Sequence, residues 1–360
     1  MISDSALFNF RHYAQPIDAY NSVGSIDYTG ILPGSVKLAA NENPFGCSRV
    51  VRDAFTKSLD NSHIYPDGRC AQLRKAVSNF YEISPEKLIF GAGVDELIFM
   101  LCKIFIDNKD EAIIGSATYP QYKIAVRALG GKIMYSPMKN YELDLSEVLQ
   151  RITQRTKMIF LANPNNPTGT IITSLEQEKF LRQVPKNIVV IFDEAYQEYV
   201  ISSDYPNTWE TLQRYSNVVL LKTFSKIYGL ASFRVGFCAA HPEIIKRMEK
   251  IRSPYNVSSQ AQVAACAALG DQAFVETSKI QNQHAREMLV SALRGDCILS
   301  HANFIMVKVD DDMEVCKSLL RKGYVIRPGT DFGMSGFVRV SIGTQEHMKG
   351  FLSALQDIKN

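Results

Sequence analysis

Short apolar segments separated by helix-favouring stretches fill the middle of the chain. Seven of these segments span 87–91, 111–115, 132–136, 157–162, 187–192, 217–222 and 235–239. Their apolar residues run continuously rather than alternating with polar ones, and helical patterns such as 94–106 and 174–184 separate several of them. Continuous apolar strands linked by helices are typical of a parallel sheet that is covered on both faces. The pattern predicts an α/β fold: a three-layer α/β/α domain around a mainly parallel, seven-stranded sheet.

The pattern differs towards both ends of the chain. Residues 1–40 show little periodicity and many Gly, Pro, Asn and Tyr residues, which predicts an arm that packs on the core or on a partner subunit. After Pro254 a helix-rich stretch is followed by short strand patterns near 303–309, 324–327 and 337–342. We therefore expect a large domain over 41–258 and a smaller α+β domain over 259–360.

Composition narrows the function classes. The 360 residues are 46% hydrophobic and 21% charged, with a formal net charge of +3 and no block of Lys or Arg, so neither nucleic acid nor an anionic membrane is expected as a partner. There is no secretory signal pattern and no apolar run of roughly 18 to 20 residues. Seven cysteines without a Cys-x-x-Cys pair and six dispersed histidines predict free thiols, no metal site and a cytoplasmic protein.

Unusual polar residues follow several of the predicted strands. They are Asn163-Pro-Asn-Asn-Pro-Thr-Gly169, Asp193-Glu-Ala-Tyr196, Thr223-Phe-Ser-Lys226 with Arg234 eight positions later, and Gly91-Ala-Gly-Val-Asp-Glu96 ahead of a helix. Ligands of open α/β sheets gather at the carboxyl ends of strands. Taken singly, each motif has a structural interpretation: a tight turn, a helix N-cap at Asp193, or a solvated Lys226.

Taken together, the motifs match the needs of pyridoxal 5′-phosphate. This cofactor needs a lysine to form an imine, a carboxylate on its pyridine nitrogen, and donors to its ring oxygen. Its phosphate needs a helix N-terminus, hydroxyl groups and an arginine. The Gly91-x-Gly93 turn lacks the third glycine of a dinucleotide fingerprint, which disfavours a nicotinamide cofactor.

The motifs resemble those of the fold-type-I aminotransferases that depend on pyridoxal 5′-phosphate, and most closely the histidinol-phosphate branch of that family. The resemblance is carried by the strand-end motifs at 163–169, 193–196 and 222–234. Further matching stretches lie at 38–46, 252–257, 300–304, 325–329 and 339–343. Two departures stand out, because Ala92 and Val94 replace the usual Asn and Ser, and no clear Tyr-x-Pro-Gly segment lies near Tyr13 to Tyr20.

The resemblance implies a role for each matched residue. Lys226 forms the imine and moves the proton, Asp193 pairs with the ring nitrogen, Asn166 and Tyr196 bond the ring oxygen, and Tyr119 stacks on the ring. The phosphate is held by the backbone of Val94 and Asp95 with Thr223, Ser225 and Arg234. Arg327 and Arg339, with Asn166, bind the anionic substrate. Tyr65 reaches the phosphate of a neighbouring subunit, which implies a homodimer with shared active sites.

The implied reaction is a ping-pong transfer of an amino group between L-histidinol phosphate and 2-oxoglutarate, as in histidine biosynthesis. An aromatic or broad-specificity aminotransferase would have the same core, and a decarboxylase of a phosphorylated amino acid would also use two arginines. A transcription regulator with an aminotransferase-like domain is the non-enzymatic alternative. It would need a basic helix-turn-helix extension, whereas the core motifs here begin within the first forty residues.

Overall fold

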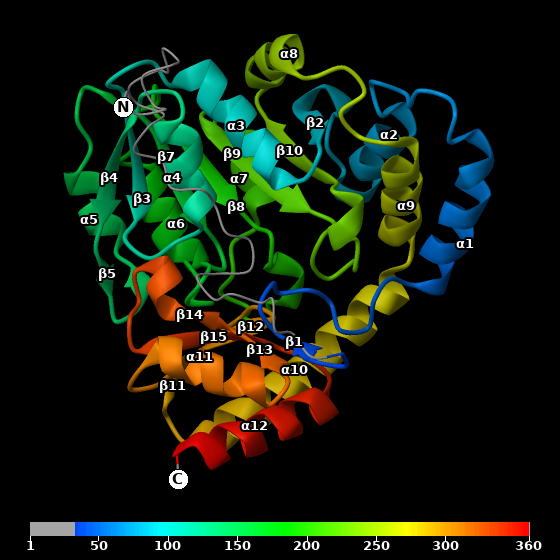
Figure 1. The fold of residues 1–360 in the computed structure, drawn as a ribbon. Coiled ribbons are helices and arrows are strands. Elements are labelled where there is room, and N and C mark those ends of the chain that lie inside the picture. The colour runs from blue at the N-terminus through cyan, green and yellow to red at the C-terminus, as the bar shows by residue number, and fades with distance from the viewer. Residues whose placement is uncertain (1–32, 360) are drawn as a thin grey trace, which may run out of the picture.

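The computed structural model of the chain describes residues 33–359. The predicted arm therefore lies outside the described residues except for its last eight positions. A seven-stranded sheet forms the centre of the larger part of the molecule (Figure 1). In spatial order its strands are β2 (Leu88–Gly91), β10 (Gly236–Ala240), β9 (Val218–Thr223), β8 (Val189–Asp193), β7 (Thr156–Ala162), β3 (Glu111–Gly115) and β4 (Lys132–Ser136).

All strands of this sheet are parallel to one another except β10, which is antiparallel to both β2 and β9. Each of the seven strands lies where the apolar segments predict it, so the predicted three-layer fold is confirmed. The alternate residues of β7 explain why these segments are continuously apolar. Met158 and Phe160 join the buried cluster on one face of the sheet, and Ile159 and Leu161 join the cluster on the other.

Helices cover both faces of this sheet. On one face lie α3 (Val94–Phe105), α4 (Pro120–Arg127) and α8 (Pro242–Ile251), and their buried residues belong to one apolar cluster. On the other face lie α2 (Ala71–Tyr81), α5 (Leu145–Gln150), α6 (Ser174–Leu181), α7 (Thr208–Arg214) and α9 (Ser259–Gly270). Helix α1 (Arg49–Ser58) packs with α2 against α9 at one side of the molecule (Figure 1).

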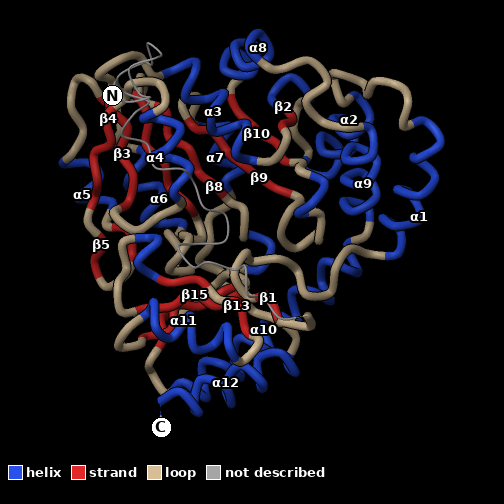
Figure 2. The backbone as a smooth tube through the Cα atoms, in the orientation of Figure 1, coloured by secondary structure: helices blue, strands red, loops and turns tan. Residues whose placement is uncertain are grey.

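A second, four-stranded sheet lies below the first in Figure 2. Its order is β11 (Cys297–Ile298), β12 (Phe304–Lys308), β15 (Phe337–Ser341) and β14 (Arg327–Pro328). Helices α10 (Gln272–Leu293), α11 (Asp312–Arg321) and α12 (Gln345–Lys359) enclose a separate apolar cluster against it. Near the start of the described chain, β1 (Val36–Lys37) pairs in parallel with β13 (Tyr324–Val325). The division into domains at 258/259 stays a prediction.

The remaining elements are short. A hairpin is formed by β5 (Met138–Lys139) and β6 (Glu142–Leu143). In the part of the chain that the structure describes, 3-10 turns span Leu59–Asn61, Pro85–Lys87, Gln197–Tyr199, Ala231–Phe233 and Gly329–Phe332. Within residues 33–359, no helix combines the length and apolarity that a bilayer crossing requires.

Candidate active site

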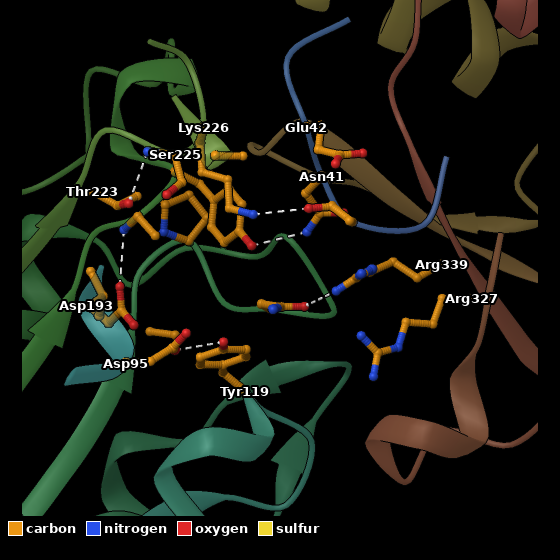
Figure 3. Close-up of a pocket in the computed structure, with 18 of the residues that line it drawn as sticks. Asn41, Glu42, Asp95, Tyr119, Asp193, Thr223, Ser225, Lys226, Arg327 and Arg339 are labelled. Carbon is orange, nitrogen blue, oxygen red and sulfur yellow. Dashed lines mark hydrogen bonds between the residues drawn. The ribbon is translucent and has the colours of Figure 1, made fainter. Parts of the chain in front are cut away.

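A pocket opens at the carboxyl ends of the central strands and faces the smaller sheet (Figure 3). Twelve of the thirteen residues predicted for the site line this one pocket: Val94, Asp95, Tyr119, Asn166, Asp193, Tyr196, Thr223, Ser225, Lys226, Arg234, Arg327 and Arg339. They come from eight separate stretches of the chain. The structure therefore brings together residues that the sequence connected through strand-end motifs and through the family resemblance.

Lys226 follows β9 in a tight turn. Its Nζ donates a hydrogen bond to the backbone oxygen of Ala40 at 3.0 Å and lies 5.6 Å from the ring centroid of Tyr196. Gly229 closes this turn with a φ of +70°, and a side chain there would sit 1.9 Å from the backbone oxygen of Gly46. Only glycine allows the 38–46 segment to approach the lysine turn so closely.

Asp193 ends β8 and is 5% exposed. Its Oδ2 accepts a hydrogen bond from the hydroxyl of Tyr122 at 2.7 Å, and its Oδ1 accepts one from the backbone N–H of Ala195 at 3.2 Å. Burial raises the pKa of Asp193 to about 6, although these two hydrogen bonds oppose the rise. Sequence reasoning missed Tyr122. Its only signal is its position three residues after Tyr119, one helical turn along α4.

The start of α3 forms an anion-binding end of the pocket. Gly93 is its N-cap, and the first-turn N–H groups of Val94 and Asp95 have no helical partner by the geometry of a helix start. Arg234 reaches over this turn, with Nη2 at 3.3 Å from Asp95 Oδ2 and Nη1 donating to Ser225 Oγ at 3.3 Å. Gly93 has a φ of +80°, a backbone conformation that favours glycine, and a side chain there would also displace the guanidinium group of Arg234.

The unusual Ala92 and Val94 leave the start of this helix intact. The carboxylate of Glu96 accepts a hydrogen bond from the backbone N–H of Ala92 at 2.6 Å and another from Asn256 Nδ2 at 2.7 Å. Tyr119 also fixes this end of the pocket, because its hydroxyl donates to Asp95 Oδ1 at 2.8 Å. The helix start is therefore held by Glu96 and Tyr119 rather than by side chains at positions 92 and 94.

Arg327 and Arg339 face each other across β14 and β15 and are 5% and 3% exposed. Arg339 donates from Nη1 to Asn166 Oδ1 at 2.6 Å and from Nη2 to the backbone oxygen of Ala39 at 2.5 Å. Arg327 donates from Nε to Asp331 Oδ2 at 3.0 Å, and both members of this pair are buried. Sequence reasoning missed Asp331, four residues beyond Arg327. These contacts hold each guanidinium group in a fixed position at the pocket wall.

Tyr65 is the one predicted site residue outside the pocket. It is 80% exposed and stacks on Tyr255, with ring centroids 4.8 Å apart. Among the described residues, no group of three or more His, Cys, Asp or Glu side chains could hold a metal ion.

Comparison with known proteins assigns the family. The family model of aminotransferase class I and II matches residues 33–355. The chain belongs to this aminotransferase family. A histidinol-phosphate aminotransferase of Caldicellulosiruptor saccharolyticus is 40% identical over 327 residues, which cover 90% of this chain and 91% of that protein. The histidinol-phosphate aminotransferase of Bacillus subtilis is 37% identical over 349 residues, which cover 96% and 95%.

Solved structures show the same aminotransferase fold. The structure of histidinol-phosphate aminotransferase from Sinorhizobium meliloti, in complex with pyridoxal-5′-phosphate, has a TM-score of 0.83 at 25% identity and covers 90% of each chain. That of the Clostridium acetobutylicum enzyme has a TM-score of 0.84 at 23% identity and covers 90% of this chain and 99% of that one. The fold-type-I architecture expected from the motifs is confirmed.

Proposed function

We propose that this aminotransferase uses pyridoxal 5′-phosphate to move an amino group between L-histidinol phosphate and 2-oxoglutarate, a step of histidine biosynthesis. The observation that carries the proposal is the arrangement of charges in the pocket. A lysine amine and a buried carboxylate lie at its centre, a helix start with Arg234 lies at one end, and two buried arginines lie at the other. The names of relatives that are 40% identical support histidinol phosphate as the substrate.

The residues of the pocket fit the cofactor. When bound, pyridoxal 5′-phosphate supplies an aldehyde that condenses with amines and a cationic ring that withdraws electrons from the substrate. Asp193 would hold the proton on the ring nitrogen, because its buried carboxylate gains most by pairing with a cation. The helix start at Val94 and Asp95 would hold the phosphate, with Arg234. Thr223 and Ser225 would supply hydroxyl groups there.

Lys226 and the two arginines would divide the remaining work. Lys226 would hold the cofactor through its amine until the amine of a substrate displaces it. The freed amine of Lys226 would then take the proton from Cα of the substrate and return it to C4′ of the cofactor. Arg327 and Arg339 would bind the anionic end of either substrate, the phosphate of histidinol phosphate or a carboxylate of 2-oxoglutarate. Their low exposure excludes water from these ion pairs, which strengthens them.

A substrate panel tests the proposed reaction. Purified protein would receive 2-oxoglutarate with histidinol phosphate, phenylalanine, tyrosine, aspartate or threonine phosphate, and glutamate and carbon dioxide would be measured. We expect glutamate from histidinol phosphate at the highest kcat/KM, without carbon dioxide. Glutamate from phenylalanine but none from histidinol phosphate would establish the aromatic alternative. Carbon dioxide from threonine phosphate without glutamate would establish a decarboxylase.

Borohydride trapping tests the cofactor assignment separately. Reduction of the reconstituted protein should fix the cofactor on the peptide that contains Lys226, and Lys226→Ala should abolish turnover while some cofactor binding persists. Trapping at another lysine, or a Lys226→Ala variant that transaminates at the wild-type rate, would contradict the assignment.

A homodimer with shared active sites is part of the proposal. Five large hydrophobic side chains are exposed within residues 45–65, namely Phe45, Val50, Leu59, Ile64 and Tyr65, and Tyr255 stacks on the last of them. Exposed apolar patches mark interaction surfaces, and this one stretch of the chain contributes five exposed apolar side chains. With Tyr65 outside its own pocket, a second copy is the partner that would place it at a phosphate site. We place the enzyme in the cytoplasm, because all seven cysteines are free thiols.

Mixing two inactive variants tests the shared sites. Lys226→Ala and Tyr65→Ala subunits should form hybrid dimers in which one of two sites is intact. Statistical exchange should then restore about a quarter of the activity of a two-fold symmetric dimer. A monomeric mass by light scattering, or no recovery after subunit exchange, would overturn the dimer proposal and leave the proposed chemistry standing.

A further inference from the structure

Residues 38–46 form a segment that links the smaller sheet to the lysine turn; we call it the linking segment. At its start, Leu38 donates from its N–H to Val325 O at 2.7 Å and accepts a hydrogen bond from the N–H of Ser341 at 2.8 Å. Further along, Asn43 Nδ2 donates to the backbone oxygen of Ile227 at 2.7 Å, next to Lys226. Figure 3 shows Asn41 of this segment beside Lys226 in the pocket.

The hydrogen bonds of Asn41 fix the orientation of its amide group. Its backbone N–H donates to Ser341 Oγ at 2.8 Å, so the hydroxyl hydrogen of Ser341 is available for Asn41 Oδ1, which lies 2.9 Å away. With Oδ1 accepting, Nδ2 is the atom that meets Tyr196 Oη, at 3.0 Å. An amide nitrogen can only donate, so the phenol oxygen of Tyr196 accepts this bond.

The direction of this bond determines where the hydrogen of Tyr196 points. A phenol has a single hydrogen, and an oxygen that accepts from Asn41 keeps that hydrogen for another direction. Burial raises the pKa of Tyr196, against the opposing effects of Arg339 and Asn41, so the phenol stays protonated at neutral pH. The three side chains are 1%, 3% and 6% exposed for Asn41, Ser341 and Tyr196, which leaves water little access to replace these contacts.

We propose that Asn41, oriented by Ser341, is a positioning residue that keeps the Tyr196 hydroxyl as a donor into the pocket. This proposal rests on the proposed function, in which Tyr196 bonds the ring oxygen of the cofactor. It also connects the two ends of the pocket. Ser341 lies two residues after Arg339 on β15, and Arg339 itself holds the linking segment through Ala39 O. The strand that binds the substrate anion therefore also orients the donor to the cofactor.

The experiment is a pH titration of the visible absorption of the cofactor bound to Lys226 in the complete holoenzyme. A donor to the ring oxygen stabilises the form in which the neighbouring nitrogen has lost its proton, and so lowers the titration midpoint. Asn41→Asp is nearly isosteric, but its carboxylate accepts only and would draw the Tyr196 hydrogen away from the pocket. We expect its midpoint to rise by about one pH unit, as in Tyr196→Phe, with a smaller rise for Asn41→Ala.

A double variant separates an effect that acts through the Tyr196 hydroxyl from direct attraction of the proton by the new carboxylate. A new carboxylate would also raise the midpoint by attracting the proton directly, and that effect would persist without the Tyr196 hydroxyl. Asn41→Asp combined with Tyr196→Phe should therefore shift the midpoint no further than Tyr196→Phe alone. Full additivity of the two shifts would overturn the proposal.

Ser278→Ala is the matched control. Ser278 Oγ accepts a hydrogen bond from Asn43 Nδ2 at 3.1 Å, so its loss loosens the same linking segment without touching Asn41 or Tyr196. It should lower the melting temperature and leave the midpoint unchanged, whereas Ser341→Ala should raise the midpoint. Unchanged midpoints in Asn41→Asp, Asn41→Ala and Ser341→Ala, with a shifted one in Tyr196→Phe, would show that Asn41 is only structural. A wild-type protein without any cofactor absorption would instead contradict the proposed function.

Discussion

Two clusters of ionisable residues lie on opposite sides of the central sheet. Asp193 belongs to one of them, and the next residue in sequence, Glu194, belongs to the other. Asp193 faces the pocket with Tyr122 and Lys226, whereas Glu194 lies outside that pocket. Thr208 Oγ1 donates to Glu194, and nearby Lys222 lies with its Nζ 2.6 Å from Glu198 Oε1. The two clusters differ in whether the chain itself supplies an oppositely charged partner for the buried charge.

The Lys222 cluster is satisfied by residues of the chain itself. Lys222 is 1% exposed and also donates to Gln197 Oε1 at 2.7 Å. Burial alone would lower the pKa of Lys222, but Glu198 and Glu194 outweigh that effect and raise it. The two hydrogen bonds of Asp193, by contrast, come from neutral groups, the Tyr122 hydroxyl and the Ala195 N–H, and a cavity lies beside it. Equal burial therefore supports a structural role in one case and a ligand-dependent role in the other.

The largest expected difference between the clusters is in rate. Asp193→Ala should lower kcat/KM by about 10³-fold, roughly 4 kcal/mol, because the carboxylate would keep the ring nitrogen protonated, and the cationic ring stabilises the negative charge that develops on the substrate during the reaction. Glu194→Gln should change kcat/KM by less than about tenfold. Steady-state kinetics on folded, reconstituted variants measure both. A loss below about tenfold in Asp193→Ala would contradict the proposed electrostatic role.

Stability should show the reverse order. Lys222→Met removes the cation from two buried carboxylates and should lower the free energy of unfolding by about 3 kcal/mol. Chemical denaturation of the cofactor-free protein measures it. Replacing Glu198 by Gln in the same variant removes the stranded charge and should recover much of the loss. Lack of any recovery would mean that Lys222 stabilises the fold by packing alone.

The pH dependence of stability should separate the two carboxylates. Burial raises the pKa of Glu194 to about 7 and that of Asp193 to about 6. A carboxyl group whose folded pKa is raised stabilises the fold below its unfolded pKa and loses that contribution as pH rises through the folded pKa. Cofactor-free protein should therefore lose stability between pH 4.5 and 7, and Glu194→Gln should remove about 2 kcal/mol of that loss.

Cofactor binding sharpens this test. A bound cationic ring would lower the pKa of Asp193. Adding the cofactor should therefore abolish the contribution of Asp193 to the pH dependence of stability, the same contribution that Asp193→Asn abolishes in the cofactor-free protein. The part that belongs to Glu194 should remain with and without cofactor. If reconstitution leaves the contribution of Asp193 unchanged, the ring nitrogen does not pair with Asp193.

The sequence predicts which residues line the pocket much better than it predicts the partners that hold those residues in place. Strand ends are encoded locally, in apolar runs followed by polar residues, and the family resemblance added Tyr119, Arg327 and Arg339; together they gave the twelve predicted residues that line one pocket. The partners of those residues depend on which elements become neighbours in the folded chain. Tyr122 reaches Asp193 from 71 positions away in sequence, and Asn41 meets Ser341 from 300 positions away. No local pattern encodes such pairs, and the role of Tyr65 depends on a second chain.

Tyr122→Phe should give the smallest effect of these variants. It tests whether the Tyr122 hydroxyl controls the charge of Asp193. The Tyr122 hydroxyl opposes the burial that raises the pKa of Asp193, so its loss should raise that pKa further. Binding of pyridoxal 5′-phosphate to the cofactor-free variant should weaken by up to about tenfold at pH 6 and remain near the wild-type value at pH 8.5, where the carboxyl group is ionised in both proteins. Equilibrium titration of fluorescence across this pH range measures the affinity.

Tyr119→Phe is the contrasting variant, because Tyr119 bonds Asp95 and its loss should weaken binding equally at both pH values. A pH-independent loss in Tyr122→Phe as well would mean that the tyrosine shapes the pocket without controlling the charge of Asp193.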